Sequence, residues 1–178
     1  MNLIISLLYA PIVFYSLRNF EIPVVSLCIG FASFLWLIFS IKKGITYYIF
    51  PLVYLTISLL AFFLNDMLFL KLLPAILSGL ISFFILYTYV TNNSFIFLFL
   101  ERIHKKVEEN EKKYIQQSTL FWFFISLFNL LIHCYILYIQ DIIYWTYYSS
   151  IGWYGIFMVG GIIQFIHKKI FLNRRNFA

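Results

Sequence analysis

Six continuous apolar runs, separated by polar connections, dominate the pattern of the chain. They cover residues 3–17, 22–41, 45–64, 72–91, 118–139 and 147–166. A helix rises about 1.5 Å per residue, so about 20 residues cross the roughly 30 Å hydrocarbon core of a bilayer. Because the runs do not alternate with polar residues, they indicate helices and not strands. The pattern predicts an all-α, polytopic membrane helix bundle of about six transmembrane helices, the first one short.

The first run is the weakest of the six, because it covers only about 22 Å as a helix. Pro11 lies near its middle and favours a kink. A signal peptide is the alternative, but no Lys or Arg precedes the apolar stretch, and no pattern of small residues marks a cleavage site before Arg18. We expect a retained helix, thin or tilted; if it fails to cross, the other five keep their orientation.

Composition agrees with a membrane location. The chain is 63% hydrophobic and 11% charged, whereas soluble domains are about half apolar and about a quarter charged. Lipid must therefore cover much of the surface, and we expect residues 1–178 to form a single transmembrane domain. Cys28 and Cys134 both lie in apolar runs, so no disulfide framework is predicted.

The positive charges predict the orientation. The connections after the second and fourth runs carry two and five Lys or Arg residues, and the tail, residues 168–178, carries four. The other connections carry only Arg18 and Lys71. The positive-inside rule therefore places both termini in the cytoplasm. The basic tail is predicted to anchor the last helix at anionic membrane lipids. Nucleic-acid binding is a poor fit, since these charges directly follow a membrane run, and we expect no nucleic-acid partner.

The longest connection, residues 92–117, has the pattern of an amphipathic helix. Asn92, Asn93 and Ser94 are good helix-start residues, and bulky apolar side chains recur every four residues at Phe95, Phe99, Ile103 and Val107. We expect a cytoplasmic helix between the fourth and fifth membrane helices, continuing into the fifth. One interpretation is that Phe95, Phe99 and Ile103 dock a membrane or cytoplasmic protein partner. The other is a solvated connector that is merely helical.

One face of the fifth run is polar. Six side chains lie within about 40° of one direction at about 100° per residue: Ser118, Trp122, Ser126, Asn129, His133 and Gln140. Unmet polar groups in hydrocarbon cost several kcal/mol, so this polar face must meet other helices or a wet cavity. Either the face joins helices, or Ser126, Asn129, His133, Trp122 and Gln140 bind the polar group of a lipid or a translocated solute.

Small residues mark further contact faces, because small-xxx-small spacing lets helix backbones approach closely. The clearest face is Ser26, Gly30 and Ser33 on the second run. Packing within the chain is the first interpretation of such faces, and a homodimer is the second.

Motifs for chemistry are missing from the sequence. No Asp, Glu, Lys or Arg lies in the middle of a run, which argues against proton-coupled pumping. His133 has no acid at its depth for a catalytic triad, and His104, His133 and His167 lie too far apart in depth to share a metal. No phosphate-binding loop or dinucleotide fingerprint is present. We predict no cofactor and no metal site, and these absences argue against enzymatic activity without deciding it.

A set of scattered residues resembles a known family. They are Leu70-Lys71-Leu72-Leu73-Pro74, Glu101-Arg102, Tyr114, Trp122, Phe124, Asn129, Trp145, Tyr148 and Tyr154. Over roughly residues 64–169 the chain resembles small bacterial inner-membrane proteins of unknown function, some of them mislabelled as a component of DNA gyrase. It is more distantly similar to the intracellular septation protein A family. The resemblance implies the bacterial inner membrane and, because members are often encoded beside lipid-synthesis genes, an envelope role. The neutral Gln164 stands where an acid is expected.

Two functional hypotheses follow from these patterns. The first is a non-enzymatic accessory protein of the inner membrane, serving cell-envelope or lipid-linked biogenesis through protein contacts. The alternative is a carrier for a lipid or amphipathic small molecule that uses the polar face of the fifth run. A membrane-embedded acyl or glycosyl transferase ranks third, for want of a base or metal site.

Overall fold

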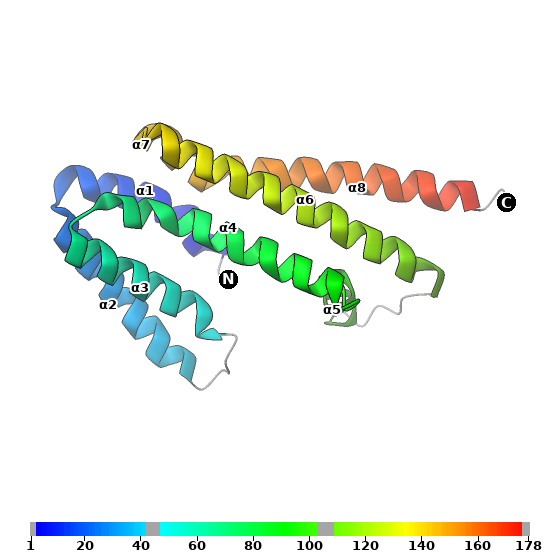
Figure 1. Ribbon diagram of the computed structural model, residues 1–178, viewed down its shortest axis with the longest axis horizontal. Helices are drawn as coiled ribbons and strands as arrows, with labels where there is room; N and C mark the ends of the chain where they lie inside the picture. The colour runs from blue at the N-terminus through cyan, green and yellow to red at the C-terminus, as the bar shows by residue number, and fades with distance from the viewer. Residues whose placement is uncertain (1–2, 42–46, 103–108, 176–178) are drawn as a thin grey trace. The chain divides into compact units, whose positions relative to one another are not determined.

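The computed structural model describes residues 3–41, 47–102 and 109–175 (Figure 1). All elements in these ranges are helical, which confirms the all-α class. They are α1 (Leu3–Asn19), α2 (Ile22–Ser40), α3 (Ile49–Leu64), α4 (Met67–Val90), α5 (Phe95–Arg102), α6 (Glu109–Ile139), α7 (Ile142–Tyr147), a π-helical turn (Tyr148–Gly152) and α8 (Trp153–Arg175).

Four helical segments are long and apolar enough to cross a membrane. They are Ile22–Ser40, Met67–Val90, Glu111–Ile139 and Ile142–Ile170. α3 is a shorter apolar helix of 16 residues, and α1 has 17 residues. The four long segments point to a helical membrane protein, while the count of six spans stays a prediction.

The described chain divides into two compact units. The first holds residues 1–76 and 133–151, and the second holds residues 77–132 and 152–178. α4 and α6 are continuous helices that contribute to both units.

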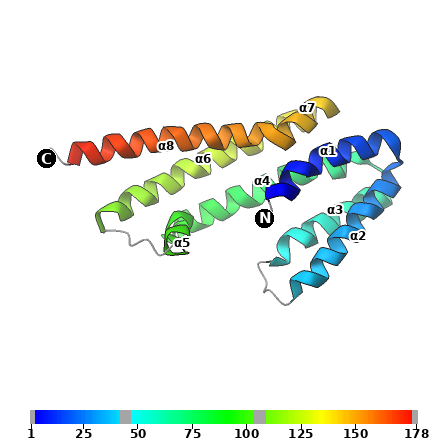
Figure 2. The same cartoon turned by 180° about the vertical axis from the view of Figure 1, so that it is seen from behind.

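In the first unit, α2 packs along α3, and α1 contacts α2 and α7; α2 and α3 lie side by side in both views (Figure 1, Figure 2). Ser26, Gly30 and Ser33 are buried on α2. A Cβ atom added to Gly30 would lie 2.9 Å from the Ser58 Oγ of α3. The prediction that these small residues let helices of one chain pack closely is confirmed for α2.

Two turns of the first unit have the same arrangement, a residue with a left-handed backbone followed by an aspartate. Asn65 and Gln140 adopt left-handed backbone conformations, with φ of 50° and 61°, and end α3 and α6. An aspartate follows each of them and begins the next helix. The Asp66 carboxylate accepts a hydrogen bond from the Leu68 amide at 2.8 Å, and the Asp141 carboxylate accepts from Ile143 and Tyr144. Both aspartates therefore cap helix starts, as Asp does at N-caps.

The second unit joins α4, α5, α6 and α8. Ser94 begins α5, and its hydroxyl accepts a hydrogen bond from the Ile96 amide at 3.1 Å. The same hydroxyl pairs with that of Thr119 on α6, and the Gln116 amide group of α6 donates to the Tyr89 carbonyl of α4. The structure thus has a helix at Phe95–Arg102 that starts after Ser94. Its cytoplasmic position stays a prediction, and its predicted continuation through Ile103 and Val107 lies outside the described residues.

Two predicted boundaries were wrong. Lys71 was assigned to a connection, but α4 begins at Met67 and contains it. The sixth run was expected to begin at residue 147, whereas helical structure begins at Ile142 and passes through the π-helical turn before α8. The fifth run agrees with the prediction that a helix from the connection continues into it, because α6 extends from Glu109 to Ile139.

Candidate functional site

The five residues predicted to bind a ligand divide between the two units. Trp122, Ser126 and Asn129 belong to the second unit, and His133 and Gln140 belong to the first. Gln140 is exposed and ends α6 with its positive φ angle. Its side chain therefore lies at a turn rather than along the helix face on which the sequence pattern placed it.

Asn129 joins α6 to α4 inside the second unit. Its side chain is buried, and its Nδ2 donates a hydrogen bond to the Ser78 Oγ at 2.8 Å. Ser126, one turn earlier, is buried as well, and its hydroxyl donates to the Phe123 carbonyl of its own helix at 2.9 Å. Both polar groups are thus engaged within the chain, as unmet polar groups in hydrocarbon would be unfavourable.

Trp122 joins α6 to α8. Its indole Nε1 donates a hydrogen bond to the Gln164 Oε1, and its ring stacks on Phe157 with centroids 6.0 Å apart. The backbone approach is close, because a Cβ atom added to Gly160 of α8 would lie 3.4 Å from the Trp122 ring. The Tyr114 hydroxyl also donates to the Gln164 carbonyl at 3.3 Å. Gln164, which sequence analysis marked only as a departure from a family pattern, therefore connects two helices.

His133 lies in the first unit and is buried. Its ring approaches the Tyr148 ring edge-on, with centroids 4.8 Å apart. Tyr148 opens the π-helical turn, in which Ser149 and Ser150 are also buried. The Ser149 hydroxyl has no hydrogen-bond partner among the described residues. π-Helical turns are frequent at functional sites, and this one begins at the tyrosine that contacts His133.

A cluster that the sequence analysis missed surrounds Pro74 in the first unit. Proline has no backbone N–H, so Pro74 leaves the carbonyl four residues earlier, that of Leu70, without its intrahelical donor. The Tyr9 hydroxyl of α1 donates to that carbonyl at 2.9 Å. Leu70 is fully buried. A side chain 61 residues away therefore replaces the hydrogen bond that the proline removes, as membrane helices require.

The carbonyl of the next residue in α4, Lys71, also accepts a hydrogen bond from a distant side chain. The Trp145 Nε1 of α7 donates to the Lys71 carbonyl at 2.9 Å, and Trp145 is the largest fully buried side chain in the described chain. The Lys71 side chain is only 4% exposed, and its ammonium lies 3.4 Å from the Gln140 carbonyl. Asp141 and Asp66 interact electrostatically with it. Lys71 thus ties α4 to the turn between α6 and α7.

The polar contacts of this Pro74 cluster join helices of the first unit. Its hydrogen bonds run from side chains to backbone carbonyls, and its one cation interacts with two helix-capping aspartates. In the described ranges no group of three His, Cys, Asp or Glu side chains converges to hold a metal ion. The sequence signal for the cluster was a proline within an apolar run together with a lysine close to it, but neither residue indicates its distant partners.

The predicted docking residues lie on or beside α5. Phe99 is 62% exposed and Leu98 is also exposed, whereas Phe95 is half-buried. Ile103 lies outside the described residues. The described part of α5 therefore presents one large exposed ring from the predicted set, Phe99.

Comparisons of the chain with models of protein families, with curated proteins and with solved structures find no match.

Proposed function

We propose that the chain is a non-enzymatic accessory protein of the bacterial inner membrane that acts through contacts with other proteins. The observation that supports this proposal is that three polar side chains of α6 already form hydrogen bonds within the protein. Asn129 is engaged by Ser78, Trp122 by Gln164, and Ser126 by its own helix. Asn129 and Trp122, which would meet a passing solute, instead join α6 to α4 and to α8. The further step to envelope or lipid-linked biogenesis rests on the family resemblance.

The proposed topology has six helices in the membrane and both termini in the cytoplasm. Its support is the concentration of Lys and Arg in alternate connections and in the tail. α1 and α3 would cover about 24–26 Å each at 1.5 Å per residue. A shortfall of a few ångströms is met by local thinning of the bilayer at modest cost. In this topology α5 lies on the cytoplasmic side.

Phe99 is the proposed contact for a partner protein. The experiment places a photoactivatable phenylalanine analogue at Phe99 and, as a matched control, at Phe83 of α4, which is similarly exposed. Irradiation of intact cells should give a discrete protein adduct from position 99 and lipid adducts from position 83. Lipid adducts alone from both positions would contradict the proposal.

The second candidate function is a carrier for a lipid or amphipathic small molecule. The observations that favour it come from residues of the first unit. His133 is buried against Tyr148, and the Ser149 hydroxyl next in the chain has no partner in the described ranges. Replacing Asn129 and His133 together with Leu would abolish transport in a folded protein if the carrier hypothesis holds. Loss of folded protein in that variant would instead show that these side chains serve helix packing.

A further inference from the structure

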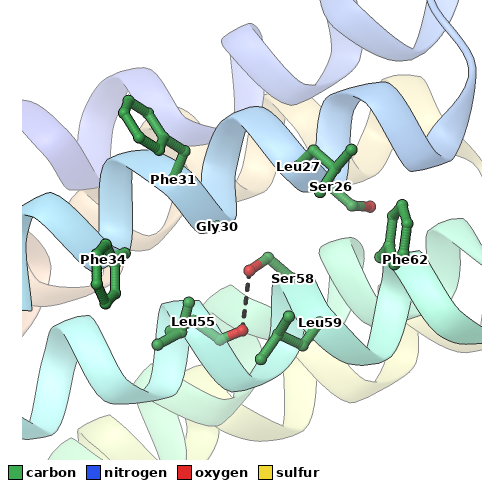
Figure 3. A pocket seen from close by; sticks show the side chains of 9 residues that line it. All are labelled: Ser26, Leu27, Gly30, Phe31, Phe34, Leu55, Ser58, Leu59 and Phe62. Atoms are coloured by element: carbon green, nitrogen blue, oxygen red, sulfur yellow. Dashed lines mark hydrogen bonds between the residues drawn. The ribbon is translucent and has the colours of Figure 1, made fainter.

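A groove of about 280 Å³ runs between α2 and α3 in the first unit (Figure 3). Its walls are apolar, with Leu27 and Phe31 from α2 and Leu59 and Phe62 from α3. Among the described residues that line it, the polar side chains are those of two serines, Ser26 and Ser58. The groove is open along one side, so its occupant must come from the surroundings of these helices.

Ser26 is the one hydroxyl of this groove without a partner. The side chain is 1% exposed, and its Oγ has no hydrogen-bond partner among the described residues. The Ser58 and Ser33 hydroxyls instead donate to carbonyls of their own helices, at 2.9 Å and 2.7 Å. Figure 3 shows the Ser26 hydroxyl on the side of α2 that faces α3, toward the Phe62 ring. An unpaired hydroxyl in apolar surroundings is unfavourable and calls for an acceptor.

We propose that this groove binds one acyl chain of an ester lipid, whose carbonyl oxygen accepts a hydrogen bond from the Ser26 hydroxyl. The groove volume equals that of about nine waters at roughly 30 Å³ each, and a methylene group is of similar size. Ser26 lies about 7 Å along the helix from Glu21, and Phe34, at the far end of the groove, lies about 12 Å further on. A carbonyl near the membrane surface and a hydrocarbon tail below it match this layout.

A lipid tail fits the groove better than a second protein helix does. Membrane helices approach each other through exposed small residues, but here Gly30 and Ser58 already face each other across the α2–α3 contact. The rim is formed by bulky exposed side chains, among them Phe31 and Leu59. These side chains keep a helix backbone out, whereas a thin hydrocarbon chain passes between them. The lipid site does not depend on the protein contacts proposed for α5.

The test uses the full chain in vesicles of phosphatidylethanolamine and phosphatidylglycerol that contain a phosphatidylethanolamine with a photoactivatable diazirine in one acyl chain. After irradiation, adducts are mapped by mass spectrometry of peptides. Leu59→Trp fills the groove, and Leu60→Trp is the matched control, since Leu60 is the next residue, is similarly exposed and does not line the groove. Adducts on groove residues should fall about fivefold or more in Leu59→Trp and stay unchanged in Leu60→Trp.

A second comparison tests the role of Ser26. A probe with an ether-linked chain lacks the carbonyl, so the ester probe should label the groove about two- to tenfold more strongly, and Ser26→Ala should remove that preference. Labelling spread evenly over α2 and α3, or labelling insensitive to Leu59→Trp, would overturn the proposal.

Discussion

The hydrogen bond from Tyr9 to Leu70 offers a sharp test of how the first unit is held together. Tyr9→Phe removes only the hydroxyl and keeps the ring, which packs edge-on against Tyr54 with centroids 5.5 Å apart. The variant leaves the Leu70 carbonyl without a donor, because Pro74 supplies no N–H. The expected result is a loss of stability that depends on the proline.

The size of the loss follows from burial. The Tyr9 hydroxyl and the Leu70 carbonyl are 2.9 Å apart in a buried site. An unsatisfied buried acceptor costs about 1–3 kcal/mol in proteins generally, and measured hydrogen bonds in membrane proteins average about 0.6 kcal/mol with a maximum near 1.7 kcal/mol. Because Leu70 is fully buried, we expect Tyr9→Phe to lower the free energy of unfolding by about 1–1.5 kcal/mol.

A double-mutant cycle isolates the role of the proline. Pro74→Ala restores the N–H that the Leu70 carbonyl lacks, so Tyr9→Phe in that background should cost no more than about 0.3 kcal/mol. The coupling between the two positions should then be about 1 kcal/mol. The assay is equilibrium unfolding of the purified chain in mixed micelles, and Tyr15→Phe is the control, since Tyr15 lies on the same helix and is exposed.

The reasoning is refuted if Tyr9→Phe costs the same in both backgrounds. Such a result would mean that the hydroxyl stabilises the protein without regard to the gap that Pro74 leaves in α4. An effect of Tyr15→Phe as large as that of Tyr9→Phe would point to loss of an aromatic hydroxyl in general rather than to this hydrogen bond.

Two further predictions concern packing. Asn129→Leu removes the donor to the buried Ser78 hydroxyl, so it should lower the free energy of unfolding in micelles by about 1 kcal/mol; stability equal to that of the parent would show that the pair contributes nothing. Gly30→Ala places a Cβ atom 2.9 Å from the Ser58 Oγ and should destabilise, whereas Gly155→Ala meets no atom within 4 Å and should be neutral or stabilising by up to about 1 kcal/mol. Equal thermal midpoints for the two glycine variants would contradict the close α2–α3 contact.

The apolar runs predicted most of the helices, but they misplaced the start of a helix that contains a charged residue. The second run, 22–41, matches α2 at Ile22–Ser40, whose N-cap residue is the charged Glu21. The fourth run was begun only after Lys71, since a lysine is typical of a connection. The structure keeps Lys71 inside α4, where the Gln140 carbonyl and two aspartates interact with the ammonium. Gln140 and Asp141 are distant in sequence, so no local pattern indicates them.

The sequence predicted which residues form the polar face of α6, but not which residues they contact. Periodicity correctly placed Asn129 and Trp122 on α6, yet their partners Ser78 and Gln164 lie on other helices. Side-chain periodicity says which residues need partners and not which residues supply them. The Pro74 cluster was missed for the same reason, because the donors Tyr9 and Trp145 become relevant only once the helices pack.

The path of the chain across the membrane underlies the proposed function, and topology reporters measure this path directly. Fusions of a fluorescent protein that folds only in the cytoplasm, and of a phosphatase active only in the periplasm, would be placed after residue 178, within residues 103–108, and at the turns that contain Asp66 and Asp141. We expect fluorescence from the first two sites and phosphatase activity from the two aspartate turns. Phosphatase activity at the tail or the connector, or a chain that stays soluble without detergent, would contradict the proposed topology.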